Sequence, residues 1–192
     1  MKGVVVVAAA TLFAATAAAA GERPAVRPSH DVAVSYRIEA AGPGGAPVSS
    51  EVRMYWTGQG THLRLEMAGQ PGYALIDFTA NRMTFVIGAK QAFVELPFDP
   101  RAAPGLNIPA DVTMTPAGND SVAGQPCVVW DMRGPQNSGR ACITQDGLVL
   151  QVHGGGDGQP ALEATSVAYG PQPPSLFTIP AGFKPVSPGS VP

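Results

Sequence analysis

Residues 51–67 read EVRMYWTGQGTHLRLEM, and they contain two runs in which apolar and polar residues alternate. A period of two places the apolar side chains on one face of a β-strand. If like faces oppose each other, Trp56 pairs with Leu63 and Met54 pairs with Leu65. This stretch therefore predicts an antiparallel hairpin that has one apolar face and one polar face.

The same register determines the turn and the polar face of this hairpin. It leaves Gln59-Gly60 as a two-residue loop, which is a common connection between antiparallel strands. It also sets Arg53 opposite Glu66 and Tyr55 opposite Arg64. Cross-strand pairs on a solvated face contribute only a few tenths to about 1 kcal/mol each, so we expect them to help define the register rather than to drive folding.

Strand patterns recur along the rest of the chain. Val32 to Ile38 alternates in the same way, and shorter apolar runs follow at 73–78, 83–87, 92–96, 112–115, 148–152 and 162–169. Residues 97–109 hold four prolines and predict a loop, and residues 171–174 (PQPP) predict a stiff connector before a tail. Because about ten segments are typical of strands and none sustains a helical repeat, we predict a mostly antiparallel β fold. Its strands either stack as two sheets or curl around an apolar interior.

The first residues are typical of a secretory signal. A lysine at position 2 precedes an apolar run over 3–15, and small residues occupy 17–20. We predict a signal peptide over 1–20 that is cleaved near Ala20; an uncleaved membrane anchor is the alternative. The mature chain is then a flexible segment over 21–30, one β-rich domain over 31–186 and a flexible tail over 187–192, with no integral membrane segment. The predicted location is periplasmic or secreted.

Charge excludes one class of partner. The 192 residues carry 12 Lys and Arg against 14 Asp and Glu, which leaves a formal net charge of -2, and only 14% of the residues are charged. An average soluble domain is roughly 25% charged. A chain with so few positive charges is not expected to bind nucleic acid through its phosphates.

Cys127 and Cys142 are the only cysteines. Export to an oxidising compartment favours a disulfide between them. The residues between them read as strand, turn cluster and strand, so one hairpin can carry the bridge with Cys127 opposite Cys142 and Val129 opposite Arg140. A redox-active pair normally has closer spacing, and two cysteines without a histidine pair do not make a zinc site.

The remaining motifs favour no catalytic or metal chemistry. The three histidines, His30, His62 and His153, are far apart and none belongs to a metal-binding motif. The sequence His153-Gly154-Gly155-Gly156 is like an oxyanion loop, but the chain has no G-x-S-x-G nucleophile turn to accompany it. The carboxylates are spread singly along polar faces, and no glycine-rich phosphate loop is present. We predict no catalytic residue, no metal and no cofactor.

The strongest candidate for a binding site is the apolar row along the successive strands. Methionine and aromatic side chains in this row are suited to an adaptable surface for acyl chains, although an ordinary core explains the same pattern. The predicted ligand-binding residues are Tyr36, Ile38, Met54, Trp56, Leu63, Leu65, Met67, Met83 and Phe85.

Several blocks of the chain resemble a family of small exported bacterial proteins. They are Leu63 to Met67, Ile76 to Phe78, Met83 to Val86, Phe93 to Leu96, Val122 to Cys127 with Cys142 and Asp146-Gly147, and Ser175 to Phe183. That family resembles the periplasmic lipoprotein-carrier (LolA/LolB-like) superfamily. The resemblance implies a curved antiparallel sheet that forms an incomplete barrel, with little helix and with an apolar concave face that accepts acyl chains. Residues 21–30 depart from the carriers, because they hold two prolines and no pattern of an amphipathic helix.

These observations lead to one main hypothesis and two alternatives. The main hypothesis is a non-enzymatic exported protein that binds a lipid or a lipidated protein on the concave face. The first alternative is an envelope domain that binds another protein and has a filled core and no ligand. The second is a hydrolase, which requires a serine, a histidine and a carboxylate brought together from distant strands. The sequence leaves the ligand and the oligomeric state open.

Overall fold

A computed structural model describes residues 23–41, 46–100, 106, 108–109, 111–135, 138–154 and 161–188. The predicted signal peptide at 1–20 lies outside these residues. The described part of the chain forms twelve strands: β1 (Val32–Ala41), β2 (Pro47–Trp56), β3 (His62–Met67), β4 (Gly72–Asp77), β5 (Arg82–Ile87), β6 (Ala92–Pro97), β7 (Thr113–Val122), β8 (Gln125–Arg133), β9 (Ser138–Ile143), β10 (Val149–His153), β11 (Leu162–Tyr169) and β12 (Lys184–Pro185).

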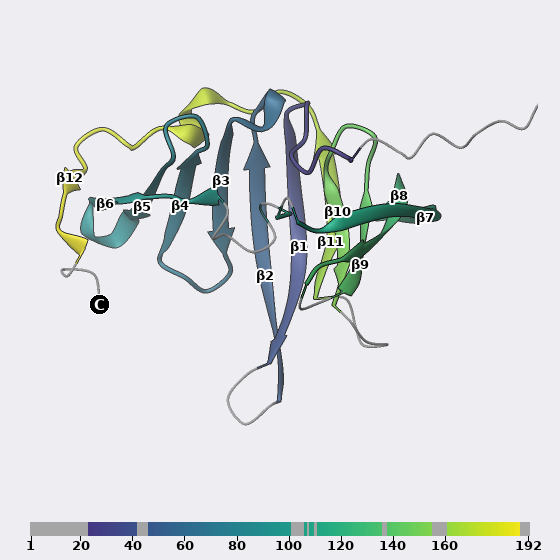
Figure 1. Ribbon diagram of the computed structural model, residues 1–192. Coiled ribbons are helices and arrows are strands. Elements are labelled where there is room, and N and C mark those ends of the chain that lie inside the picture. The colour runs from purple at the N-terminus through teal and green to yellow at the C-terminus, as the bar shows by residue number, and fades with distance from the viewer. Residues whose placement is uncertain are drawn as a thin grey trace, which may run out of the picture.

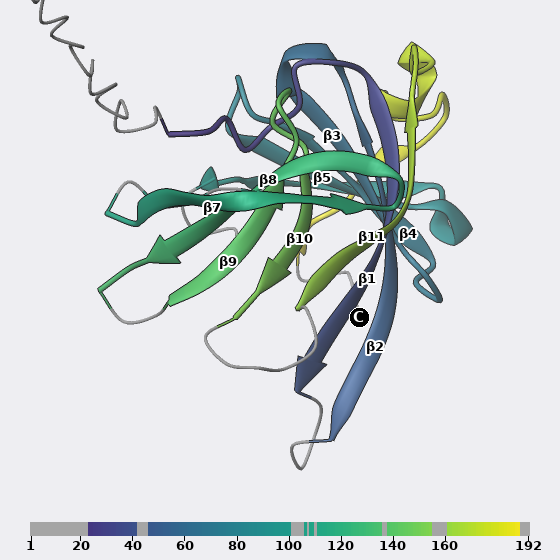
Figure 2. The ribbon, with the colours of Figure 1, turned by 90° about the vertical axis from the view of Figure 1, so that its right-hand side faces the viewer.

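All twelve strands belong to one curved sheet (Figures 1 and 2), in the order β12-β6-β5-β4-β3-β2-β1-β11-β10-β9-β8-β7. The chain passes by hairpins from β1 to β6, crosses to the opposite edge at β7, and returns to β11 beside β1. The two edge strands, β12 and β7, do not pair with each other, so the sheet is an incomplete barrel, as predicted. All pairs are antiparallel except that of β12 with β6.

Helical structure in the described residues is confined to short 3₁₀ turns. Those given bounds are η2 (Gly58–Gly60), η3 (Gly88–Lys90) and η5 (Pro174–Phe177). The expectation of little helix is confirmed.

The register of the β2–β3 hairpin is the predicted one. Trp56 lies opposite Leu63, and Met54 lies opposite Leu65. The predicted two-residue loop is wrong, because β2 ends at Trp56 and β3 begins at His62, so the five residues 57–61 join the strands and include the 3₁₀ turn η2. Within this turn Gln59 and Gly60 both have positive φ, at 68° and 59°. The alternation of apolar residues was sufficient here, because a slip by one residue would turn every apolar side chain to the solvated face.

The disulfide between Cys127 and Cys142 is present, but the hairpin that carries it has a different register. Val129, not Cys127, lies opposite Cys142. The two sulfur atoms therefore join positions that are diagonal across β8 and β9, with their Cα atoms 5.5 Å apart. The observed register leaves four residues, 134–137, between the strands. The sequence predicts Cys127 opposite Cys142, and this register is wrong by two residues, because β9 already begins at Ser138 and Ser138 pairs with Arg133.

Strand β7 is longer than the sequence predicts. It runs for ten residues although Pro116 and Gly118 lie within it, and a register shift falls between these two residues. Proline is tolerated in a sheet at edges and bulges, and β7 is an edge strand with a bulge at this point. Pro116 and Gly118 are therefore compatible with this edge strand.

The main hydrophobic core lies between β1–β3 and the disulfide half of the sheet. Leu63, Leu148, Leu150 and Val32 are among its fully buried residues, and the disulfide belongs to the same cluster. The Tyr36 hydroxyl crosses this core and donates a hydrogen bond to the Val149 carbonyl at 2.7 Å. The curvature of the sheet thus lets one half of its apolar face cover part of the other half.

Candidate functional site

The predicted apolar row lies on one face of β1 to β5, because the strand register aligns its members. Across these strands, Val34, Met54, Leu65, Ala74 and Phe85 form one line of neighbours. A parallel line consists of Val32, Trp56, Leu63, Ile76 and Met83. Residues two apart on a strand share a face, so both lines belong to the same apolar surface.

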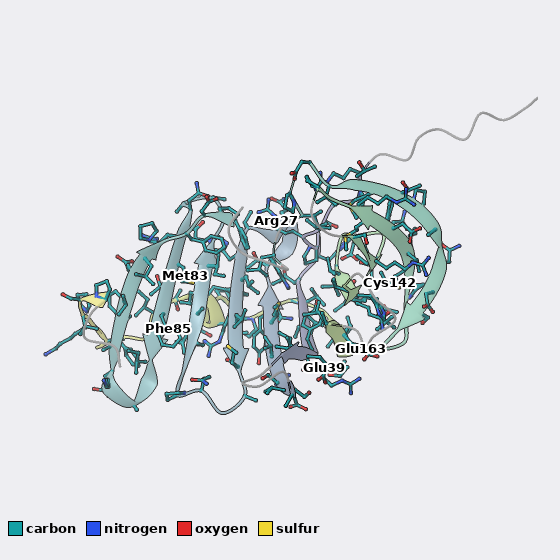
Figure 3. The ribbon with its side chains drawn as sticks, turned by 60° about the horizontal axis from the view of Figure 1, so that its bottom comes forward. Arg27, Glu39, Met83, Phe85, Cys142 and Glu163 are labelled. Atoms are coloured by element: carbon teal, nitrogen blue, oxygen red, sulfur yellow. A yellow bond between two sulfur atoms is a disulfide. The ribbon has the colours of Figure 1, made fainter. Side chains whose placement is uncertain are left out.

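The structure divides this row into two parts that differ in burial. Tyr36, Met54, Trp56 and Leu63 are buried in the main core. Ile38, Leu65, Met83 and Phe85 are only partly buried, and Met67 is 44% exposed. Figure 3 shows Met83 and Phe85 on the open half of the sheet, away from Cys142 in the curled half.

The cause of this division is the curl of the disulfide half. Cys127, Cys142, Leu148 and Leu150 pack with the buried members of the row in one cluster. The partly buried members lie farther along the sheet, on β3 and β5, apart from Ile38 at the end of β1. The curl therefore covers only part of the row.

An aromatic cluster closes one end of the row. The Trp56 and Phe78 rings stack with centroids 5.7 Å apart, and Phe98 meets Phe78 edge to face at 5.6 Å. The guanidinium carbon of Arg27 lies 4.8 Å from the centroid of the Phe78 ring, a cation–π geometry. The Trp56 indole nitrogen is buried and has no hydrogen-bond acceptor among the described residues.

A cavity of about 520 Å³ borders the exposed end of the row. Met67 lines it together with polar residues of β2, β3 and β4, among them Arg53, Glu66 and Tyr73, and with the β3–β4 turn. The sequence predicted only that Arg53 and Glu66 lie on a solvated face. Their alternation with the apolar row was the only available signal, and it does not show that a turn folds beside them.

A hydrolase requires a histidine beside a serine and a carboxylate. Of the three histidines, His30 lies near both kinds of group. The Ser29 hydroxyl is 3.1 Å and the Asp146 Oδ2 atom is 3.6 Å from the same atom, His30 Nδ1. A catalytic triad requires the hydroxyl and the carboxylate on different nitrogens of the imidazole. This cluster does not have that arrangement. It instead lies where Ser29 joins the turn after β9, through a bond from the Ser29 N–H to the Asp146 carbonyl.

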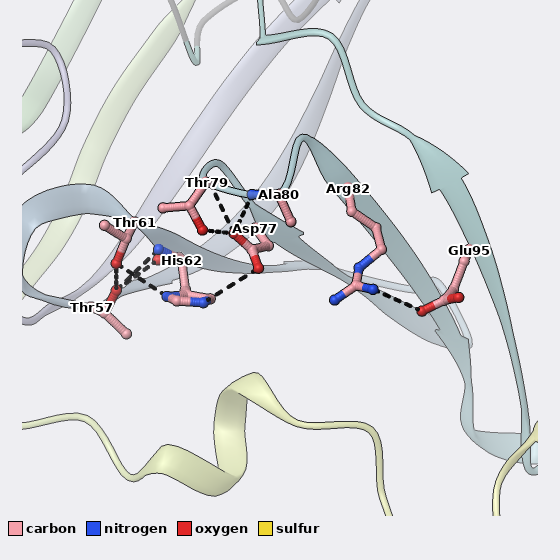
Figure 4. A network of polar contacts seen from close by, with 8 residues as sticks. All are labelled: Thr57, Thr61, His62, Asp77, Thr79, Ala80, Arg82 and Glu95. Atoms are coloured by element: carbon pink, nitrogen blue, oxygen red, sulfur yellow. Dashed lines mark hydrogen bonds and ion pairs between the residues drawn. The ribbon is translucent and has the colours of Figure 1, made fainter.

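His62 belongs to a polar network at the end of the β2–β3 hairpin (Figure 4). Its Nδ1 lies 3.1 Å from the Thr61 hydroxyl, and its Nε2 lies 3.7 Å from Asp77 Oδ2. The Thr61 hydroxyl is also hydrogen-bonded to the Thr57 hydroxyl, and the Thr57 hydroxyl accepts a hydrogen bond from the His62 N–H. This network fastens the hairpin end to the turn after β4.

The other oxygen of Asp77 organises that turn. It accepts hydrogen bonds from the Thr79 hydroxyl and from the N–H groups of Thr79 and Ala80. The Thr79 hydroxyl, followed by the Ala80 N–H, lowers the pKa of Asp77 below its ordinary value. Asp77 is therefore a carboxylate at neutral pH.

Metal ligands do not gather anywhere in the described ranges, where no group of three His, Cys, Asp or Glu side chains could hold a metal ion. No helix in that part of the chain is long and apolar enough to span a membrane.

The fold and the row define a class: an open, curved antiparallel sheet with a partly covered apolar face. No protein-family model and no curated protein sequence matches the chain. Among solved structures, it is similar to an uncharacterized conserved protein from Thermus thermophilus, with 12% identity over 83% of this chain and 91% of the other and a TM-score of 0.54. It is also similar to MucB, with 17% identity over 81% of this chain and 59% of MucB and a TM-score of 0.52.

A LolA superfamily protein from Nitrosomonas europaea is a further match. The identity is 13% over 80% of this chain and 92% of the other, with a TM-score of 0.41. The incomplete barrel implied by the sequence resemblance is the fold observed. These likenesses concern the fold.

Proposed function

We propose that the protein is an exported, non-enzymatic binding protein that takes an acyl chain of a lipid or a lipidated peptide on the open half of its apolar face. The observation that carries the proposal is the incomplete cover of Leu65, Met67, Met83 and Phe85, which continue a core that is otherwise closed. The fold of an open barrel supports it, because an unclosed sheet can leave room for a guest beside its own core.

The chemistry of the open half suits a flexible apolar ligand. Met67 and Met83 are unbranched and polarizable, so their side chains adapt to chains of different shape. Complete burial of a fully exposed side chain of this size contributes about 1.5–3 kcal/mol, and an acyl chain would gain the part of this that corresponds to the exposed fraction of the four side chains. The buried members of the row, Tyr36, Met54, Trp56 and Leu63, would form the floor beneath the ligand rather than contact it along its length.

The test combines native ligand identification with direct binding. The mature protein is purified from its native compartment and extracted with organic solvent, and the extract is analysed by mass spectrometry. Separately, displacement of the fluorescent probe N-phenyl-1-naphthylamine by palmitate is measured. We expect a bound lipid and saturable displacement. A clean extract together with no displacement would exclude the proposal.

A matched pair of variants locates the binding surface. Met67→Glu places a charge on the open half, whereas Val48→Glu does so at the far end of β2, where the side chain is 45% exposed, close to the 44% of Met67. We expect at least a tenfold loss of palmitate affinity in Met67→Glu and no change in Val48→Glu. Equal affinity in both variants would place the ligand elsewhere.

A second candidate is an envelope domain that binds another protein through a filled core. The burial of Tyr36, Met54, Trp56 and Leu63 favours it, since almost half of the predicted ligand-binding residues already have protein partners. MucB, which has a similar fold, has been solved in complex with MucA. Co-purification of one stoichiometric protein partner with a lipid-free extract is the result expected for this candidate.

Export is tested on the chain itself. The predicted signal peptide should be absent from protein recovered from the periplasmic or secreted fraction. Intact mass is the measurement, and a mass corresponding to cleavage near Ala20 is expected. Recovery of the full-length mass from a membrane fraction would favour the uncleaved anchor instead.

A further inference from the structure

The C-terminal segment at 171–186, which we call the strap, crosses the face of the sheet opposite the apolar row. Arg64 donates a hydrogen bond to the Leu176 carbonyl at 3.2 Å, which holds the strap over β3. At its other end, the Lys184 N–H donates to the Gln91 carbonyl and the Val186 N–H donates to that of Phe93, so the strap is fastened along β6. The strap is thus fixed at both ends, and the part between them spans β4 and β5.

A cleft of about 290 Å³ lies between the strap and the sheet. Side chains from all four of the strands β3–β6 line it, and Phe177, Thr178 and Ile179 of the strap line its other side. Figure 4 shows the strap passing along the polar residues of this face. The polar residues of the lining alternate with the members of the apolar row, and none of Leu65, Met67, Met83 and Phe85 lines the cleft, so it is distinct from the acyl-chain surface proposed above.

Thr84 lies inside this cleft with an unused hydroxyl. The residue is only 6% exposed and lines the cavity. Its hydroxyl has no hydrogen-bond partner among the described residues, and its oxygen is not one of their fully buried unpartnered polar atoms, so it can be reached from the cleft. The hydroxyl is therefore free to donate and accept a hydrogen bond with a bound molecule.

Two polar side-chain pairs, one of which contains a histidine, surround Thr84. His62 Nε2 is 3.7 Å from Asp77 Oδ2, and Arg82 Nη1 is 3.7 Å from Glu95 Oε1. Both distances are longer than a good charge-assisted hydrogen bond of about 2.7–2.9 Å, so a ligand group can insert between the partners. Arg82 is set against two carboxylates, Asp77 and Glu95, so the cleft has no excess of positive charge that would attract a free anion.

We propose that this cleft binds a neutral saccharide ring. A sugar hydroxyl both donates and accepts, so vicinal hydroxyls can bridge Arg82 and Glu95 while another hydroxyl satisfies Thr84. The C–H face of the ring can pack on Phe177 and Ile179, which supply the apolar part of the lining. The volume is at the lower limit of small-molecule sites, which run from about 300 Å³, and it therefore suits one ring rather than an extended glycan.

The experiment uses saturation-transfer difference NMR on the folded full domain with D-glucose and N-acetyl-D-glucosamine as probes. Thr84→Val removes the hydroxyl with little change of shape, and Glu95→Gln removes one charge at a half-exposed site where folding is tolerant. Thr115→Val, at an exposed position on β7, is the control. We expect saturable binding of at least one sugar, a loss of tenfold or more in Thr84→Val and Glu95→Gln, and no change in Thr115→Val.

Several outcomes would overturn this assignment. One is the absence of saturable binding for both sugars. Another is an affinity for the sugar that is unchanged in both Glu95→Gln and a correctly folded Thr84→Val. If Thr84→Val does not fold, the affinity of Glu95→Gln alone decides. Binding of L-alanine in place of the sugars, abolished by the same variants, would assign the cleft to a zwitterion. Met67→Glu should leave sugar binding unchanged, so this site and the acyl-chain surface succeed or fail separately.

Discussion

Replacement of Tyr36 by Phe should destabilise the protein at neutral pH without changing its affinity for an apolar ligand. The Tyr36 side chain is 3% exposed, and its hydroxyl satisfies the Val149 carbonyl at a point where the pairing of β9 and β10 shifts register. The Phe variant removes this part-buried hydrogen bond. We expect a loss of about 1–2 kcal/mol in the free energy of unfolding at pH 7.

The same substitution should change the response to alkali. Burial, and then the proximity of Tyr169, raises the pKa of Tyr36 well above its ordinary value. The folded protein therefore keeps this proton, while the unfolded chain releases it near pH 10. The stability is fully present below pH 10 and is lost as the pH rises further. At pH 11 the wild type loses about 1.4 kcal/mol through this group, and Tyr36→Phe does not.

Urea unfolding of both proteins at pH 7, 9 and 11, with the disulfide intact, measures the difference. The wild type should be the more stable by a constant amount at pH 7 and 9, and its advantage should shrink by about 1.4 kcal/mol at pH 11. Tyr169, whose pKa is raised to about 12, is present in both proteins and does not contribute to the difference. A difference that stays constant up to pH 11, or equal stability at pH 7, would refute the reasoning.

Three further predictions concern stability. Gly60→Ala should cost about 1–2 kcal/mol in thermal unfolding, because φ is +59° and the new Cβ would lie 2.6 Å from Arg27 Cβ. The control Gly88→Ala has open space around the new Cβ and should cost well under 1 kcal/mol. Equal losses of stability in the two variants would contradict this prediction. Loss of the disulfide in the Cys127→Ala, Cys142→Ala double variant should cost about 3 kcal/mol in urea unfolding, and no loss would show that the constraint on the unfolded chain is negligible. Asp77→Asn should lower the free energy of unfolding at neutral pH. Because the pKa of Asp77 is lowered in the folded protein, the difference in stability between wild type and variant should diminish as the pH falls below about 4. A difference that persists unchanged at pH 2 would argue against a role for the charge.

The sequence was sufficient for the local pairings in which apolar and polar residues alternate strictly. The β2–β3 register followed from placing Trp56 opposite Leu63. The disulfide also followed, since two cysteines have one possible pairing, but its register did not. A disulfide can join diagonal positions across two strands as well as directly opposite ones, and the spacing of the two cysteines does not decide between them.

Segments rich in proline were the hardest to interpret. Strand β7 contains Pro116, and the strap begins with the prolines at 171–174. Proline excludes a central strand but permits an edge strand or a fixed extended segment, and the local sequence does not show which position a segment will take in a sheet. The cleft beneath the strap was missed for this reason.

The sequence by itself determined the class of fold, the side of each alternating strand that is apolar, and the pairing of its two cysteines. Only the tertiary structure decided that Trp56 and Leu63 are core while Met67 and Phe85 remain partly open, and that Thr84 lies beneath the strap. The physical reason is that a period of two depends on the local geometry of one strand. What covers a face depends on the curvature of the whole sheet and on segments that are distant in the chain.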